Sequence, residues 1–374
     1  MNIPFLDLGR LNAPYMDEIK PALLRVASSG RYIGGEEVAG FESRLAGYTG
    51  RRYAIGVSNG LDALRLILEG YKCLGLMADN DEVIVPANTY IATILAIETA
   101  GLRPVLVEPS PVTLNIDSGR IEAAITPRTR AIMTVHLYGR VAWDTTMSAI
   151  ADKYGLLVIE DNAQAIGSVS QLPGRSGSLM AGGLGDAAAF SFYPTKNLGA
   201  LGDAGAVATD DEDLARAVRA LANYGSDRRY HNIYRGYNCR LDPMQAAVLS
   251  AKLPGLDRNN SRRREIAAIY DSTITNPIVR LHRVDPQSLT NYHQYVISVE
   301  GDREAFRSRL AEAGVATDIH YAVPPHLQPC YKDKFPGEYP LTEKIAREVV
   351  SLPIAPYLTD DEAGYVASVI NTCL

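Results

Sequence analysis

Residues 51–71, "RRYAIGVSNGLDALRLILEGY", join a strand to a helix through one short turn. The apolar, β-prone run over 51–57 predicts the strand, and "SNG" predicts the turn. Four apolar side chains then follow at the spacing of one helix face: Leu61, Leu64, Leu68 and Tyr71. A strand that leads directly into a helix is the repeating unit of α/β folds, so this stretch predicts that class.

The same alternation of strands and helices continues to about residue 210. Further strands are predicted within 81–90, 103–108, 131–139, 156–164, 186–193 and 205–211, and further helices over 91–101, 143–155 and 212–225. Because such helices cover both faces of a sheet, we expect mostly parallel strands sandwiched between two helical layers.

The pattern changes after about residue 242. Long helices are predicted over 244–253 and 259–274, and a later α+β section contains 293–300, 302–314, 316–321 and 360–374. With 374 residues, the chain exceeds one ordinary hydrophobic core. We therefore predict a large domain over residues 1–250 and a smaller C-terminal α+β domain over residues 251–374.

Composition argues against several classes of protein. A net charge of −6 without a basic block disfavours a nucleic-acid binder. The cysteines Cys73, Cys239, Cys330 and Cys373 are scattered, which predicts reduced thiols and no metal site. The amino-terminal residues lack the features of a signal peptide, and no run of about 18 apolar residues occurs. We therefore expect a cytoplasmic protein without a membrane segment.

Two of the predicted strands end in polar residues, where open α/β sheets bind their ligands. Ser58, Asn59 and Gly60 begin a helix, and free backbone N–H groups there would cradle an anion. Alternatively, Ser58 or Asn59 only caps the helix. Asp161 ends the apolar strand within 156–164, and a buried carboxylate there is costly unless a cation pairs with it. A protonated pyridine nitrogen would be such a cation, although Asp161 could also be a helix cap.

A lysine follows on the loop between two predicted strands, in "FSFYPTKNLGALGDAGA" at 190–206. Lys196 could be an ordinary solvated loop residue, but a partly desolvated lysine can form a Schiff base. Ser191 could direct its hydroxyl to a phosphate or be a core serine. Gln164 could donate to a ring oxygen, and Tyr90 could stack on a flat ring or simply pack. Together these groups suit pyridoxal 5′-phosphate.

These residues resemble the DegT-type family of sugar-nucleotide aminotransferases, which are pyridoxal-phosphate enzymes of the fold-type I aminotransferase architecture. The resemblance extends nearly end to end, from "SGRYIGGEEVAGFE" through "SNGLDAL", "PANTYIAT" and "EDNAQAIGS" to "IHYAVPPHLQP". The lysine segment combined with "GYNCRLDPMQAA" is highly specific. The family more often has alanine at Asn162 and histidine at Ile166, and neither departure removes a group that the chemistry needs.

The resemblance implies a role for each matching cofactor residue. Lys196 would hold the cofactor covalently and move the proton, and Asp161 would pair with the pyridine nitrogen. The other implied cofactor contacts are Ser58, Asn59, Gly60 and Ser191 at the phosphate, Gln164 near the ring hydroxyl and Tyr90 on the ring face. Asn238 would reach the phosphate of the neighbouring subunit's cofactor, which implies a homodimer with shared active sites.

The resemblance also implies substrate contacts. His320 and His326 match a segment near the sugar, and Tyr193 is a further candidate. Arg228 and Arg229 match a loop near the nucleotide diphosphate, where guanidinium groups suit anionic oxygens, although they could equally be a solvated charge run.

We expect transfer of an amino group from L-glutamate to a keto-sugar nucleotide. Relatives that dehydrate their substrate have histidine in place of the lysine, so Lys196 favours transamination. "SNGLDAL" resembles the branch that acts on dTDP-linked 3-keto-6-deoxyhexoses, with 4-keto sugars or UDP-linked 3-keto sugars as alternatives. A non-catalytic, cofactor-binding regulator and a nicotinamide-dependent sugar oxidoreductase are the competing classes. The first would need a basic module, and "NLGALGDAG" does not fit the dinucleotide fingerprint of the second.

Overall fold

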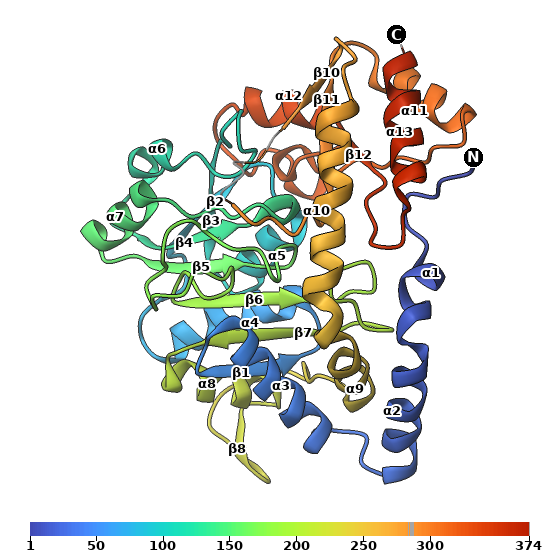
Figure 1. The fold of residues 1–374 in the computed structure, drawn as a ribbon. Helices are drawn as coiled ribbons and strands as arrows, with labels where there is room; N and C mark the ends of the chain where they lie inside the picture. Colours follow the sequence, from blue (N-terminus) through green and yellow to red (C-terminus); the bar gives the residue numbers. More distant parts are fainter. Residues whose placement is uncertain (283, 285–287, 374) are drawn as a thin grey trace.

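The computed structural model describes residues 1–282, 284 and 288–373, and its centre is a seven-stranded sheet (Figure 1). The strand order is β1-β7-β6-β5-β4-β2-β3. The strands are β1 (Tyr53–Val57), β2 (Glu82–Pro86), β3 (Arg103–Val107), β4 (Thr129–Val135), β5 (Leu157–Asp161), β6 (Ala187–Ser191) and β7 (Gly205–Thr209). The pairs that β7 forms with β1 and β6 are antiparallel and the other four pairs are parallel, so the prediction of a mostly parallel sheet is confirmed.

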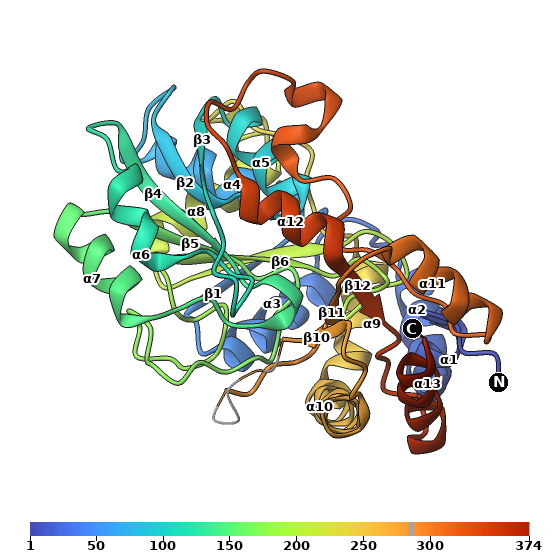
Figure 2. The same cartoon turned by 90° about the horizontal axis from the view of Figure 1, so that it is seen from above.

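Helices cover both faces of this sheet, as the β/α alternation predicted. In β6, Ala187 and Ala189 pack against α4 (Gly60–Cys73) and α8 (Glu212–Ala222), while Ala188 and Phe190 pack toward α3 (Glu36–Thr49). Successive side chains of a strand point to opposite faces, so a strand buried on both sides is apolar throughout. Figure 2 shows α4 and α5 (Ile91–Thr99) on one side of the sheet and α3 on the other.

The remaining helices lie around this sandwich and in the C-terminal part. They are α1 (Leu8–Asn12), α2 (Met16–Ser29), α6 (Ser118–Ile121), α7 (Thr145–Tyr154), α9 (Pro243–Lys252), α10 (Leu256–Thr273), α11 (Arg303–Glu312), α12 (Pro340–Glu348) and α13 (Asp360–Thr372). A short hairpin of β8 (Ser226–Arg228) and β9 (His231–Asn232) projects from the body (Figure 1).

A second, smaller core forms in the C-terminal part of the chain. Its antiparallel sheet has the order β10 (Val279–Leu281), β11 (Tyr295–Val299) and β12 (Val349–Leu352). Helix α10 runs from the large sheet to this small sheet (Figure 1). The amino terminus also packs here, because the Ile3 N–H donates to the Gly314 carbonyl at 2.7 Å. The division between residues 250 and 251 stays a prediction.

Two predicted segments differ from the structure. The strand expected over 131–139 ends at Val135, because the chain turns through Tyr138, which has a φ of 63°. Residues 316–321 form only a single bridge, between Asp318 and Ser351 of β12, a strand that the sequence pattern did not indicate. Within the described residues, no helix is long and apolar enough to cross a membrane.

Candidate active site

A cavity of about 450 Å³, here called the main cavity, opens at the carboxyl ends of β1, β5 and β6. This volume lies in the range of small-molecule sites, and the position is the one that open α/β sheets use. Many of the predicted site residues line it, namely Asn59, Gly60, Tyr90, Asp161, Gln164, Ser191, Tyr193, Lys196 and His320. The fold therefore brings together residues from five distant stretches of sequence.

Lys196 lies at the wall of the main cavity rather than on an open loop. Its backbone N–H donates to the Tyr193 carbonyl at 2.8 Å, and the Ala200 N–H donates to the Phe192 carbonyl at 2.8 Å, so the loop is a compact turn. Burial lowers the pKa of Lys196 to about 8, against the opposing attraction of Asp161. Among the hydrogen bonds of the described residues, none involves the Lys196 ammonium, so the amine is available for chemistry.

Asp161 is 6 % exposed and is held by two donors. The Thr93 hydroxyl donates to Oδ2 at 2.8 Å, and the Ala163 N–H donates to Oδ1 at 3.2 Å. Burial raises the pKa of Asp161, while the Thr93 hydrogen bond works in the opposite direction. As a cap of the next turn, Asp161 would use only Oδ1, which accepts the Ala163 N–H. The alternative that Asp161 is only a helix cap therefore does not explain the contact of Oδ2 with Thr93. A cation bound in the cavity would stabilise a buried carboxylate of this kind.

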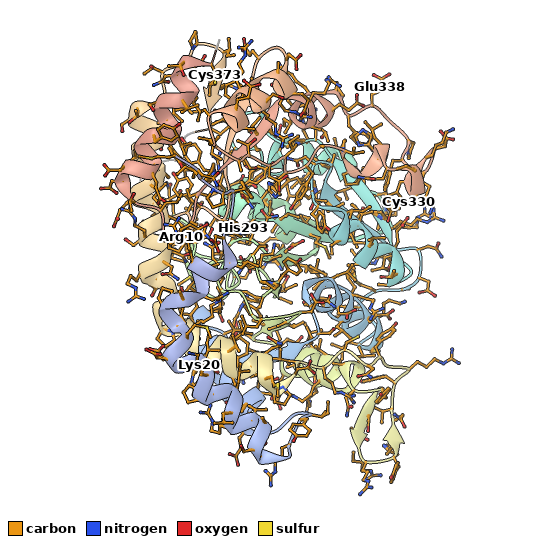
Figure 3. All side chains as sticks on the ribbon, turned by 90° about the vertical axis from the view of Figure 1, so that its right-hand side faces the viewer. Arg10, Lys20, His293, Cys330, Glu338 and Cys373 are labelled. Carbon is orange, nitrogen blue, oxygen red and sulfur yellow. The ribbon has the colours of Figure 1, made fainter. Side chains whose placement is uncertain are left out.

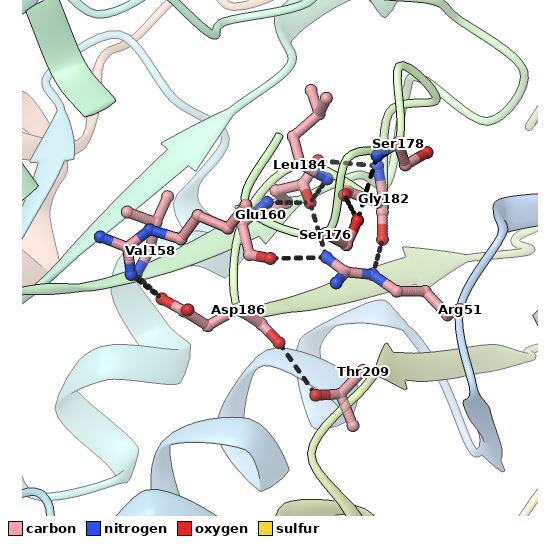
Figure 4. A network of polar contacts seen from close by, with 12 residues as sticks. Arg51, Val158, Glu160, Ser176, Ser178, Gly182, Leu184, Asp186 and Thr209 are labelled. Atoms are coloured by element: carbon pink, nitrogen blue, oxygen red, sulfur yellow. Dashed lines mark hydrogen bonds and ion pairs between the residues drawn. The ribbon is translucent and has the colours of Figure 1, made fainter. Parts of the chain in front are cut away.

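The strand residue beside Asp161 anchors the end of β5 in a buried network (Figure 4). Glu160 is fully buried and accepts hydrogen bonds from the N–H groups of Gly182 at 2.7 Å and Leu184 at 2.8 Å. His136 Nε2 lies 2.9 Å from this carboxylate, and Arg51 Nη2 lies 3.5 Å away. Burial alone would raise the pKa of Glu160, but His136 and Arg51 hold it below its usual value.

The start of α4 forms the opposite wall of the main cavity. Asn59 caps this helix, since its Oδ1 accepts the Asp62 N–H at 2.8 Å, so the capping alternative holds for this residue. Gly60 is required here, because a Cβ atom would lie 2.7 Å from the Ser191 Cβ. The backbone at the start of α4 therefore approaches Ser191 closely, and the helix N-terminus, which favours anions, lines the main cavity. Ser58 does not line the main cavity and instead donates to the Asp62 carboxylate.

Aromatic and amide groups complete the wall near the second helix. The rings of Tyr90 and Tyr321 lie 4.9 Å apart between centroids. Gln164 accepts the Tyr138 N–H at 2.7 Å and donates from Nε2 to the Tyr321 hydroxyl at 3.1 Å. Gln164 is therefore fixed in orientation, and Tyr90 is 50 % exposed at the wall of the main cavity.

The residues present fit pyridoxal 5′-phosphate. A cradle without a side chain at Gly60 faces Ser191, a buried carboxylate needs a positive partner, and a lysine with a lowered pKa faces the same cavity. The cavity therefore supplies one group for each part of the cofactor, namely the phosphate, the pyridine nitrogen and the aldehyde.

Several predicted residues lie outside the main cavity of this chain. Arg228 and Arg229 are exposed on the β8–β9 hairpin, and Arg229 donates to the Tyr230 hydroxyl at 3.1 Å. Asn238 forms a bridge with Asn223, and His326 Nε2 lies 3.3 Å from Glu343. Their roles, like those assigned to the residues that do line the cavity, stay predictions.

Sequence reasoning missed several residues that line the main cavity, among them Thr89, Thr195, Asp203, His293, Gln294 and Tyr321. Tyr321 follows His320 directly, so a wider reading of "IHY" would have included it. His293 precedes β11, far along the chain from Lys196, and no local pattern indicates that it faces the same space.

Comparison with known proteins agrees with this geometry. Residues 15–371 match the DegT/DnrJ/EryC1/StrS aminotransferase family. The chain is 50 % identical over 369 residues to dTDP-3-amino-3,6-dideoxy-alpha-D-galactopyranose transaminase of Aneurinibacillus thermoaerophilus, covering 99 % of each chain.

Two solved structures are closely similar to this fold. The S. venezuelae DesV crystal structure in complex with a ketimine intermediate superimposes with a TM-score of 0.93 at 43 % identity, covering 99 % of this chain and 98 % of that one. NtdA from Bacillus subtilis with bound cofactor PMP has a TM-score of 0.89 at 34 % identity, covering 99 % and 84 %. The expected architecture and the expected family are thereby confirmed, and this chain belongs to the DegT/DnrJ/EryC1/StrS aminotransferase family.

Proposed function

We propose that this protein is a pyridoxal-phosphate-dependent transaminase that moves an amino group from L-glutamate to a dTDP-linked 3-keto-6-deoxyhexose. One observation carries the proposal: Lys196 and Asp161, with pKa values shifted in opposite directions, face the same cavity. The sugar assignment is supported by the 50 % identical relative, whose name gives a dTDP-3-amino sugar as the compound concerned.

The positions of the residues support the roles proposed for them. When bound, the cofactor supplies an electron sink for the carbon that loses its proton. Lys196 would hold the cofactor covalently, and its amine, with a pKa near 8, can both take and return a proton near neutral pH. Asp161 would keep a positive charge on the pyridine nitrogen. Asn59, Gly60 and Ser191 would hold the phosphate at the start of α4.

We also propose a homodimer, because several residues expected at the site lie outside this chain's own main cavity. Asn238 would then reach the phosphate site of the partner subunit, and the exposed Arg228 and Arg229 would meet the nucleotide diphosphate. His320 lines the main cavity and would contact the sugar together with Tyr193, with His326 farther out. A cytoplasmic location belongs to the same proposal.

The experiment offers the purified holoenzyme glutamate together with either a dTDP-3-keto or a dTDP-4-keto 6-deoxyhexose. NMR then identifies the carbon that carries the new amino group. We expect amination at C3 of the dTDP-linked sugar, whereas amination at C4, or a preference for UDP-linked 3-keto sugars, would replace the substrate assignment. Absence of turnover with every sugar would favour the non-catalytic regulator.

A further inference from the structure

A second, smaller cavity of about 160 Å³, here called the side cavity, adjoins the main cavity. Four residues line both of them, namely Thr195, His293, Gln294 and His320. The far wall of the side cavity consists of Phe5, Leu6, Arg263, Asp318 and Ile354. Thr195 immediately precedes Lys196, so the two cavities meet at the loop that carries Lys196, which itself lines the main cavity. Figure 3 labels His293 in the interior of the molecule, and this side chain is 7 % exposed.

Arg263 on α10 is a buried guanidinium that lines the side cavity, with only 2 % of the residue exposed. Its Nη1 donates to the carbonyl oxygens of Tyr292, at 3.1 Å, and Ile354. Its Nε is buried and has no hydrogen-bond partner. In the described part of the chain, no carboxylate forms an ion pair with Arg263.

Three arginines are buried among the described residues, and two of them, Arg263 and Arg140, have no carboxylate partner. Arg140 lines neither the main cavity nor the side cavity, so only Arg263 of these two faces a space that could hold an anion. Arg51 is 6 % exposed and pairs with Glu160 and Asp210, the latter at 2.8 Å. Burial lowers the pKa of Arg263 to about 10, so the guanidinium stays charged at neutral pH. A buried charge of one sign is costly, and an anion in the side cavity would offset that cost.

We propose that the side cavity binds a carboxylate of the amino donor through Arg263. This inference rests on the proposed transaminase function. The donor is the one substrate that must carry a carboxylate within a few bonds of the carbon that loses its proton to Lys196. Among the described residues no hydrogen bond involves Nη2 of Arg263, which leaves this end of the guanidinium for a carboxylate oxygen, whereas Nε is enclosed by protein. The side cavity has about a third of the volume of the main cavity, which suits a small amino acid rather than a nucleotide sugar.

The other groups around the side cavity are compatible with an anion. His293 Nδ1 lies 3.2 Å from Asn197 Oδ1, and burial, together with the charges of Lys196 and Arg263, lowers the pKa of His293 well below its usual value. Asp318 is the one carboxylate among the described lining residues. Its side chain is 57 % exposed, and its Oδ2 lies 3.9 Å from His320 Nε2, so it belongs to the rim.

The test separates the two half-reactions in holoenzyme carrying Arg263→Lys, with Arg264→Lys on the same helix as the matched control. Loss of the Arg263 guanidinium should raise the KM for glutamate by about 10- to 100-fold, since a hydrogen bond between charged groups is strong. The KM for the keto-sugar in the second half-reaction should stay within about twofold. Equal effects on both half-reactions, or no effect on either, would overturn the proposal.

Donor analogues identify which carboxylate is bound. Wild-type protein and Arg263→Lys are compared with glutamate, its α-amide and its γ-amide. The amide that removes the bound carboxylate should weaken the donor half-reaction strongly in wild type and much less in Arg263→Lys. If the Arg263→Lys substitution reduces the effect of either amide, the proposal is supported and that amide identifies the bound carboxylate. If the effects of the substitution and of each amide on the donor half-reaction simply add, the proposal is contradicted.

Binding without turnover provides an independent measurement. Calorimetry with glutarate on the wild-type holoenzyme should show binding that competes with glutamate. The Arg263→Lys substitution should weaken that binding about tenfold or more, and Arg264→Lys should not. If wild-type protein binds glutarate but transaminates no sugar, the proposed function fails while the side cavity stands. If Arg263→Lys does not fold, the wild-type protein still provides a test. Glutarate that competes with the keto-sugar rather than with glutamate would overturn the assignment of the side cavity to the amino donor.

Discussion

Lys196 and Lys252 have the same lowered pKa, about 8, and burial is the main cause for both. Their surroundings differ. Lys252 donates to Asn12 Oδ1 at 2.7 Å and to the Gly199 carbonyl, so its ammonium is satisfied by the fold. Lys196 faces the main cavity instead. A perturbed pKa therefore identifies a functional amine here only in combination with geometry.

Replacing each lysine by alanine separates these two roles. Lys196→Ala should reduce turnover by about 1,000-fold or more, since it removes both the covalent anchor and the proton carrier. Its melting temperature should change little. Lys252→Ala should show the reverse, with a lower melting temperature and turnover within about tenfold of wild type. Thermal unfolding and steady-state rates measured on both variants check this, and an active Lys196→Ala would end the proposal.

Asp161 offers a related test at the residue scale. Its pKa is raised in the folded protein, so below that pKa the buried group is neutral, and above it the charged form destabilises the apoprotein. Asp161→Asn should therefore leave apoprotein stability at neutral pH equal or higher, while turnover falls by at least about 100-fold. Denaturant unfolding of the apoprotein and the transamination rate are the two measurements. A less stable apoprotein with normal turnover would contradict this reading.

At the scale of elements, the network beneath β5 holds the strand end that presents Asp161. Every neighbour of Glu160 described above is a donor, including the Gly182 and Leu184 N–H groups. If glutamine replaced Glu160, its amide nitrogen would face one of these donors. Arg51 and His136 would then have a neutral, weaker partner in place of the carboxylate. The network is thus a rigid base for the site rather than part of the chemistry.

Glu160→Gln should lower the free energy of unfolding by about 3 kcal/mol or more, because it breaks a buried charge network. Chemical denaturation checks this value. Glu122→Gln is the matched control, since Glu122 pairs with Lys153 at 2.6 Å on the surface, and its loss should change the free energy of unfolding far less than Glu160→Gln does. Similar losses for the two variants would show that the buried network contributes no more than a surface pair.

The sequence predicted most elements of the large sheet, but not every direction or length. Strand–helix units such as 53–73 have clear periodicity, so β1 and α4 were expected. β6 and β7 are joined by the loop that carries Lys196, without a crossover helix, and that connection allows the antiparallel pairing observed. β12 was missed because its four residues are too few to show a period.

At the scale of the whole molecule, the site combines parts that no local pattern connects. Asn59, Asp161 and Lys196 were predicted because each ends a strand or follows one in the same sheet. His293 and Arg263 come from the C-terminal part, and only tertiary packing brings them to the cavities. Chemistry-bearing motifs were therefore predictable, whereas the residues that complete the walls were not.

The proposed homodimer is tested by mixing two inactive proteins, Lys196→Ala and Asn238→Ala. Each mixed dimer would contain one site with both residues intact. Activity should recover to about one quarter of wild type, since about half of randomly formed dimers are mixed and half of their sites are complete. Unfolding and refolding the two variants together, with each alone as a control, provides the measurement. No recovery would mean that Asn238 acts within its own subunit or not at all.

The amino-terminal segment has a practical consequence for handling this protein. Ile3 pairs with the backbone beside Gly314, Phe5 stacks on His320 with ring centroids 5.9 Å apart, and Phe5 and Leu6 form part of the side cavity wall. An affinity tag fused ahead of Met1 would thus be tethered a few residues from the side cavity, the site proposed for the amino donor. Such preparations should be judged by their glutamate half-reaction rather than by yield, because a tagged enzyme could fold normally and still handle its amino donor poorly.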